Sequence, residues 1–250
     1  MSRRIYGIIP ARGGSKGIPK KNIKRLAGYP MIAYSIAVAQ LCPRIERVIV
    51  STDSEEIAEI SRRYGAEVPF MRPAEYASDR SLDREFVMHA FAWFKQNEAV
   101  IPDYLAHLRP TTPLRDPALI DEAIAAIISN PEATCLRSGH RAPESPYKWF
   151  MRDEQGYFYG FHPDDPRPGY SNLPRQDLPT VYIPDGYVDI LRSSFVLNSD
   201  DIHGERILGY LSPMCREIDT IEDFEFLEYD LEKKGSPLFD FLKSHYPSEV

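Results

Sequence analysis

The sequence predicts an α/β fold in three layers, with a mainly parallel sheet covered by helices on both faces. Short β-branched runs at 5–9 and 48–51 are each followed by a loop and then by a helical pattern of apolar residues. This alternation continues to residue 136. Strands that alternate with helices of about 10 to 15 residues form parallel sheets with both faces buried. The 250 residues are enough for one main domain, so we expect a single domain over 1–250.

The individual elements follow from apolar spacing and from residues that start or stop helices. Ser54 is a good N-cap for one helix, and Gly65 stands just beyond its end. The expected helices span 31–41, 54–64, 81–97, 117–129 and 220–234. The expected strands span 5–9, 48–51, 68–71, 104–108 and 133–136.

Residues 139–184 break the alternation, because they are dense in proline, glycine and aromatic residues. Within them, 149–159 is expected to form a hairpin that turns at 153–156, where the sequence reads DEQG. We therefore expect an insertion in the domain, with too little regular structure to pack alone.

Composition and charge narrow the classes of function. The net charge of −7 argues against a surface that neutralises a nucleic-acid backbone, and the one basic cluster, from Arg12 to Arg25, lies in a single loop. The 3 cysteines have no CxxC spacing, so neither a disulfide framework nor a zinc site is indicated, and a cytoplasmic protein is expected. The apolar segment near the N-terminus is too short for a signal peptide or a membrane span.

The loop after the first strand, residues 10–22, has the composition of a phosphate-binding loop. Ligands of open parallel sheets bind beyond the carboxyl ends of the strands, where this loop lies. Its spacing matches neither GxxxxGK[ST] nor GxGxxG. Glycines let backbone N–H groups approach phosphates, and basic side chains add charge. These residues are Arg12, Gly13, Gly14, Lys16, Gly17, Lys20 and Lys21. A solvated basic turn is the alternative interpretation.

Residues 9–22 read IPARGGSKGIPKKN, and further segments follow along the chain: VSTD at 50–53, RPAE to SD at 72–79, RPTTPLR at 109–115, LPRQDLP at 173–179 and IDT at 218–220. With these motifs, in this order, the chain resembles the acylneuraminate cytidylyltransferases, also called CMP-sialic acid synthetases, whose opening motif is similar to the first of them. The resemblance implies a Rossmann-like nucleotidyltransferase fold that binds CTP and Mg²⁺. It also implies that residues 139–190 protrude, mediate a homodimer and complete the neighbouring sugar site.

The resemblance also assigns roles to residues of the first loop and beyond it. Arg12, Lys16 and Lys21 would be catalytic, holding the triphosphate and stabilising charge on the α-phosphate. The nucleotide would be surrounded by Ala11, Gly13, Gly14, Ser15, Asn22, Arg72 and Ser78. The implied reaction is in-line attack of the sugar's anomeric hydroxyl on the α-phosphorus, with pyrophosphate leaving and without a covalent enzyme intermediate.

The expected metal ligands depart from the family pattern. The family's Asp-x-Asp before the last helix is Glu217-Ile218-Asp219 here. Asp219 is expected to bind Mg²⁺ directly, and the longer Glu217 could act through a water. The alternative is that both acids cap the following helix and compensate its dipole.

The residues expected around the sugar also depart from the family pattern. The family's QPTSPLR begins with Arg109 in this chain, and its NGAIYI is DGYVDI at 185–190, which places Asp185 and Asp189 near the sugar. Arg109 and Asp189 could pair with each other or recognise different sugar substituents. Cations for the sugar's carboxylate are Arg175, then Lys148 and Arg109, with surface ion pairs as the alternative; Gln176 lies in the same motif as Arg175.

Other functions remain open at this point. One is nucleotidyl transfer with GTP or UTP, or to legionaminate, pseudaminate or an octulosonate, although the octulosonate enzymes' IPARYxSxRLPGKP opening is absent. Others are a nicotinamide-dependent oxidoreductase, which the strand, glycine loop and helix suggest without GxGxxG spacing, and a nucleotide-binding protein without catalysis.

Overall fold

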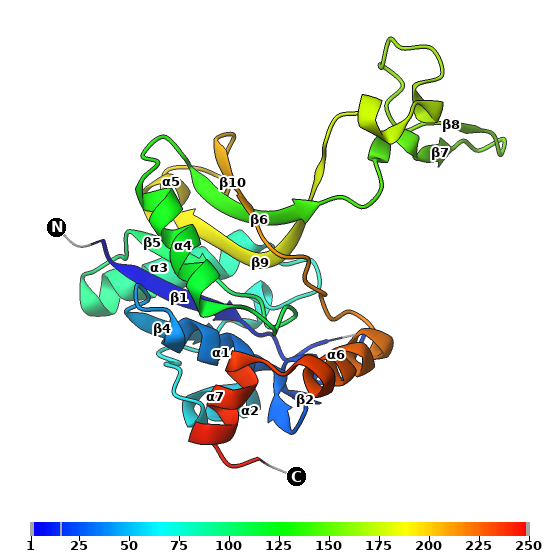
Figure 1. The fold of residues 1–250 in the computed structure, drawn as a ribbon. Coiled ribbons are helices and arrows are strands. Elements are labelled where there is room, and N and C mark those ends of the chain that lie inside the picture. Colours follow the sequence, from blue (N-terminus) through cyan, green and yellow to red (C-terminus); the bar gives the residue numbers. More distant parts are fainter. Residues whose placement is uncertain (1–2, 16, 249–250) are drawn as a thin grey trace.

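The computed structural model of the chain describes residues 3–15 and 17–248, and its centre is a six-stranded sheet. The strand order is β10-β6-β9-β5-β1-β4, and only β9 runs antiparallel to its neighbours. Figure 1 shows this sheet with helices on either side. The strands are β1 (Ile5–Pro10), β4 (Arg47–Ser51), β5 (Tyr104–His107), β6 (Cys135–Arg141), β9 (Tyr182–Arg192) and β10 (Ile207–Leu211).

The sheet separates two apolar cores, because successive side chains of a strand point to opposite faces. Ile5 and Ile9 of β1 join one core, and Tyr6 and Ile8 join the other. The first core is covered by α1 (Met31–Leu41), α2 (Glu55–Arg63), α4 (Pro117–Ile128), α6 (Ile221–Lys234) and α7 (Pro237–His245). The second is covered by α3 (Asp83–Glu98) and α5 (Ser193–Val196). The predicted α/β layers, with a mainly parallel sheet, are confirmed.

Most predicted helices are confirmed with small changes at their ends. Ser54 accepts a hydrogen bond from the N–H of Ile57 and so caps α2, and Gly65 has a φ of +83°, which suits glycine just beyond the helix. The strand expected at 68–71 is wrong. Only Glu67 forms an isolated bridge, to Ile49, and Pro69 has no N–H to extend the pairing.

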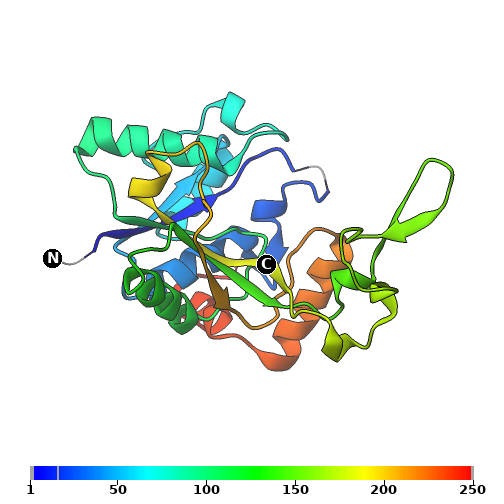
Figure 2. The same ribbon diagram turned by 90° about the horizontal axis from the view of Figure 1, so that it is seen from above.

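The chain leaves the sheet at the end of β6 and returns at the start of β9, forming an arm of residues 142–181. Figures 1 and 2 show the arm extending away from the sheet. It contains the predicted hairpin, β7 (Phe150–Arg152) paired with β8 (Phe158–Gly160), with Gly156 donating to the carbonyl of Asp153 in the turn. The expected insertion of 139–190 therefore includes, at both ends, residues that belong to the central sheet.

The remaining elements are short. A small hairpin joins β2 (Arg25–Leu26) and β3 (Tyr29–Pro30) ahead of α1. The 3₁₀ turns are Lys21–Ile23, Ala74–Tyr76, Pro146–Lys148, Tyr170–Asn172 and Arg175–Asp177. Within the described part of the chain, no helix has the length and apolar content to cross a bilayer.

Candidate active site

A cleft of about 630 Å³ opens beyond the carboxyl ends of β1 and β5. Its walls come from the loop after β1, the segment before α3, the loop after β5 and the segment before α6. The predicted residues that line it are Arg12, Ser15, Lys21, Asn22, Arg72, Ser78, Arg109, Glu217 and Asp219. The parallel strands place these distant segments at one edge of the sheet, as expected.

The loop after β1 is fixed by hydrogen bonds that its backbone donates and accepts. The N–H of Gly13 donates to Asp53 Oδ1 at 2.8 Å, and Asn22 Nδ2 donates to the carbonyl of Arg12 at 3.0 Å. Ala11 is buried behind the loop, where its N–H donates to Ser51. A Cβ added to Gly14 would meet nothing within 4 Å, so this position is open toward solvent. Asn22 therefore shapes the loop from behind while also lining the cleft.

The basic residues of the loop point in different directions. Arg12 Nη1 donates to Asp79 Oδ1 across the cleft at 2.8 Å. Lys21 Nζ, with its side chain only 15% exposed, donates to the carbonyl of Ile218 at 2.9 Å and lies 3.2 Å from Asp219 Oδ1. Lys20 turns away to Glu56 on α2. Lys16, the other expected catalytic cation, lies outside the described residues.

Glu217 and Asp219 face the loop from the opposite wall. Between them Ile218 is buried, and its N–H donates to the carbonyl of Thr111, which fixes the segment against the β5 loop. Thr111 Oγ1 donates to Glu217 Oε1 at 2.8 Å, whereas Asp219 is 71% exposed to the cleft.

Of the alternative roles of these two acids, capping of α6 is performed by other residues, while compensation of the helix dipole stays an alternative. Thr220 is the N-cap of α6, and Asp223 completes a capping box with it. Glu217 and Asp219 are therefore available to a ligand in the cleft. Among the described residues no group of three His, Cys, Asp or Glu side chains gathers around a metal position. Two carboxylates beside a phosphate loop fit Mg²⁺, which usually takes one or two carboxylates and completes its shell with phosphates and water.

The far end of the cleft is built around Arg72. Its guanidinium is buried, donates to the side chain and the carbonyl of Ser51, and lies 4.7 Å from the centre of the Phe86 ring. Burial lowers the pKa of Arg72 to about 10, so the group stays charged at neutral pH. Ser78 Oγ lies 2.9 Å from Ser81 Oγ, and both serines line the cleft. This end offers hydrogen-bonding groups, and the Phe86 ring is buried beneath the Arg72 guanidinium.

A row of charged side chains begins at the wall of the cleft and continues beyond it. Arg109 donates to Asp189 and to Asp83, each at 2.8 Å, and Arg137 holds the other oxygen of Asp189 at 3.2 Å. We call these four side chains, Asp83, Arg109, Asp189 and Arg137, the charge row. Burial would raise the pKa of Asp189, but the charges around it, that of Arg109 first, hold its pKa below the usual value. Of the two possibilities the sequence left open, Arg109 and Asp189 pair with each other.

Arg115 fixes the backbone behind this row. It is buried and donates to the carbonyls of Arg109, Gly186 and Tyr187, which ties the β5 loop to β9. Burial lowers the pKa of Arg115 to about 10. The position of the Arg109 backbone thus depends on a second arginine that does not line the cleft.

Other expected sugar-site residues lie outside the cleft of this chain. Asp185 is buried in the body, where it accepts from Ser138 Oγ at 2.7 Å and from the N–H of Tyr187 at 3.0 Å. Lys148, Arg175 and Gln176 belong to the arm, and Arg175 Nη2 donates there to the carbonyl of Ala142. A role for these three in a cleft requires the arm of another copy.

Sequence reasoning missed Asp83 and Arg137. Asp83 lies at the first position of α3, and Arg137 stands directly opposite Asp189 in the pairing of β6 with β9. Neither belongs to a contiguous motif, so no local pattern marks them. The signal that could have found them is charge balance, because a buried Asp189 requires cationic partners.

The fold and the cleft together define an α/β protein in which a glycine-rich basic loop faces two carboxylates across an open cleft. The chain shares its fold with a solved CMP:2-keto-3-deoxy-manno-octonic acid synthetase complexed with CTP. The TM-score is 0.68 over 92% of this chain and 99% of that chain, at 15% sequence identity.

A family model described as "Cytidylyltransferase" matches residues 6–149. The chain belongs to this family of cytidylyltransferase enzymes, which confirms the resemblance and removes the nicotinamide-dependent alternative.

Three curated relatives show how far the match extends. The N-acylneuraminate cytidylyltransferase of Escherichia coli is 31% identical over 98% of this chain and 56% of the relative. The CMP-N,N'-diacetyllegionaminic acid synthase of Legionella pneumophila is 41% identical over 48% of this chain and 52% of the relative. The pseudaminic acid cytidylyltransferase of Campylobacter jejuni is 32% identical over 88% of this chain and 92% of the relative. The chain thus spans about half the length of the first two and most of the third.

Proposed function

We propose that this protein transfers CMP from CTP to a nonulosonic sugar acid and releases pyrophosphate. The observation that carries the proposal is a single cleft in which a glycine-rich basic loop faces two carboxylates, Glu217 and Asp219. Relatives whose names specify sialic, legionaminic and pseudaminic acids support the acceptor class.

The residues of the cleft would act by position and charge. Arg12 and Lys21 bring positive charge to the place where the triphosphate lies, and they stabilise the charge that develops on the α-phosphate. The anomeric oxygen forms its bond to the α-phosphorus as the bond to pyrophosphate breaks, and the hydroxyl proton passes to solvent. Arg72 and Phe86, at the other end, hold the base and ribose.

Asp219 and Glu217 would hold Mg²⁺, Asp219 directly and Glu217 with its position fixed by Thr111. Bound magnesium neutralises triphosphate charge. Lys21 then keeps the Asp219 carboxylate turned toward the loop.

We also propose a homodimer formed through the arm, which exposes large aromatic side chains and would bring Lys148, Arg175 and Gln176 of one copy to the sugar site of another. A location in the cytoplasm stays a prediction from the sequence.

The test is a matrix of four nucleoside triphosphates against several nonulosonic acids, read by pyrophosphate release with Mg²⁺. The expected result is release with CTP and at least one of N-acetylneuraminic, N,N'-diacetyllegionaminic or pseudaminic acid. Release with none of these acids, from a folded protein, contradicts the proposal. A preference for GTP or UTP would show that the protein transfers another nucleotide than CMP, and the class of reaction would stay the same.

A further inference from the structure

The charge row continues past the wall of the cleft onto the face of the sheet. Asp83 and Arg109 line the cleft, while Asp189 lies directly opposite Arg137 on the neighbouring strand. Because Arg109 and Arg137 hold the two oxygens of one carboxylate, the Arg137 guanidinium lies one side chain beyond the cleft. Any acceptor that extends from the cleft along β9 meets it next.

Arg109 and Arg137 differ in how many donors they have left. One Nη of Arg109 donates to Asp189 and the other donates to Asp83, at 2.8 Å each. Arg137 uses only Nε, and its side chain is 30% exposed. The two Nη groups of Arg137 make no hydrogen bond to the described residues of the protein. They are not buried either, so they face solvent. Arg137 is thus the member of the row that has hydrogen bonds to offer a ligand.

The charge of the row indicates what kind of group it binds. Two arginines and two aspartates compensate each other, so the row has no net charge with which to attract an anion. The carboxylate of a nonulosonic acid is attached to the carbon that carries the attacking hydroxyl, so it stays at the phosphate end of the cleft. The remainder of such an acceptor carries neutral hydroxyl and acylamido groups. A guanidinium with free N–H groups is a good donor to an acylamido carbonyl.

We propose that Arg137 is a specificity-determining residue that donates hydrogen bonds to an acylamido carbonyl of the acceptor sugar. This inference rests on the proposed function, since it concerns the acceptor of that reaction. Asp189 positions the Arg137 guanidinium by holding Nε, and Arg109 keeps Asp189 in place. The charge row selects acceptors by their acyl groups, whereas the loop after β1 and the acids Glu217 and Asp219 carry out the transfer of CMP to any acceptor.

The experiment compares N-acetylneuraminic acid with its deaminated analogue, which has a hydroxyl in place of the acetamido group. N,N'-diacetyllegionaminic acid is included as an acceptor with two acetamido groups. The variants are Arg137→Met, which removes the donors, and Arg137→Lys, which keeps the charge beside Asp189 but loses the planar fork. Arg206→Met is the matched control, because Arg206 pairs with Glu132 on the surface. The readouts are kcat/KM for each acceptor, KM for CTP, and thermal unfolding.

In both Arg137 variants, kcat/KM should fall about 10- to 100-fold with the best acylated acceptor and change less than about 3-fold with the deaminated analogue. KM for CTP should stay constant, and Arg206→Met should resemble the wild type. An equal fall for both acceptors in the well-folded Arg137→Lys variant would assign Arg137 a structural role and overturn the inference. Unchanged acyl preference in both variants would also overturn it. If the wild type accepts no sugar acid, the proposed function fails first, and this inference with it.

Discussion

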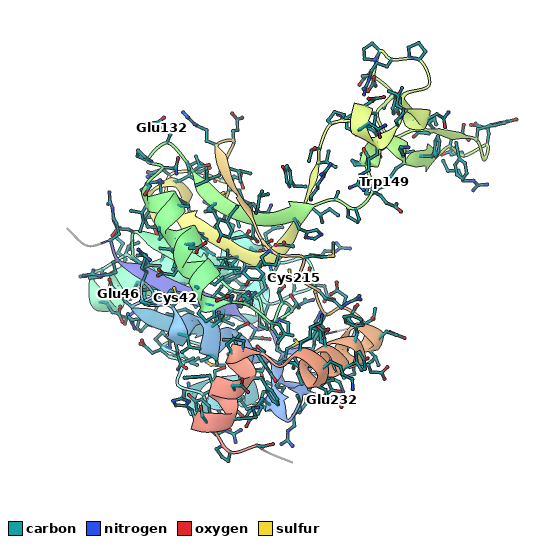
Figure 3. All side chains as sticks on the ribbon, viewed as in Figure 1. Cys42, Glu46, Glu132, Trp149, Cys215 and Glu232 are labelled. Carbon is teal, nitrogen blue, oxygen red and sulfur yellow. The ribbon has the colours of Figure 1, made fainter. Side chains whose placement is uncertain are left out.

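In the α/β body most large apolar side chains lie inside, whereas in the arm most of the large aromatic side chains lie outside. The body encloses two cores on the faces of one sheet, and its cleft residues are fixed by hydrogen bonds to buried backbone. Trp149, labelled on the arm in Figure 3, is half-exposed, and Tyr157 and Phe158 are more than 70% exposed. The arm thus presents apolar surface that another molecule can cover.

From this difference we expect the body to carry the chemistry and the arm to carry the assembly. Changes in the cleft should abolish turnover without altering the oligomer. Changes in the arm should alter the oligomer and spare nucleotide binding. The predictions below test this division, beginning with the largest expected effect.

Loss of a loop cation should have the largest effect. Arg12→Ala and Lys21→Ala should each lower kcat/KM by ~10²-fold or more, because these charges stabilise the α-phosphate as it reacts. The same is expected of Lys16→Ala. Lys20→Ala is the control from the same loop: Lys20 pairs with Glu56 on α2, so the variant should stay within about 3-fold of wild type. The measurement is kcat/KM from steady-state kinetics. A loss of kcat/KM in Lys20→Ala as large as that in Lys21→Ala would contradict these assignments.

The two acids opposite the loop should differ from each other. Asp219→Ala should lose more activity than Glu217→Ala, roughly 10²-fold, because Asp219 is open to the cleft and Glu217 is held by Thr111. Glu217→Asp should remain active. Titration of activity with Mg²⁺ provides the measurement, with a raised Mg²⁺ requirement expected for Asp219→Ala. A mild Asp219→Ala beside an inactive Glu217→Ala would show that the roles are reversed.

The arm should determine the oligomeric state. Replacing Phe150 and Phe158, whose rings lie 6.0 Å apart on the hairpin, by serine should turn a dimer into a 28.6 kDa monomer with lowered turnover. Binding of CTP should be unchanged, since the nucleotide cleft lies in the body. Light scattering at micromolar concentration measures the mass. A fully active monomeric wild type would remove the proposed role of the arm.

The smallest expected effect is on the pH dependence of thermal stability. Asp189 has a folded pKa below its unfolded value, so its ionised form stabilises the fold at neutral pH and this contribution is lost as pH falls through the folded pKa. Asp189→Asn should therefore lower Tm at pH 7 by about 4 to 8 °C, and the difference from wild type should shrink below about pH 4. Glu132→Gln, at a surface ion pair, should change Tm little at either pH. A pH-independent difference for Asp189→Asn would contradict this account.

The sequence predicted the parts of the molecule whose signals are local. The α1 helix, the N-cap of α2 and the hairpin of the arm follow from spacing and turn residues that stand next to one another. The loop after β1 and Asp219 were predicted from contiguous motifs, and the structure brings them into one cleft.

The parts that were missed depend on contacts between distant segments. The long strand β9 contains Pro184, two aspartates and Gly186 with a φ of +63°, so its sequence reads as a loop. Those aspartates are buried only because Ser138, Arg109 and Arg137 satisfy them from other elements. β10 and α7 were also not expected. The sequence of β9 does not indicate which residues it contacts. The strand can be recognised only when its pairing with β5 and β6 is known.

The two ends of the arm enter neighbouring strands of the sheet. Arg141 lies opposite Tyr182, and His140 lies opposite Ile183, so the whole arm is the connecting loop of one antiparallel pair. Lengthening such a connection costs little free energy, because the entropy of closing a loop grows only with the logarithm of its length. The arm is therefore a site at which sequence can be added, removed or exchanged while the register of β6 and β9 is kept. The surface that the arm presents to a partner can therefore change without any change to the residues of the cleft.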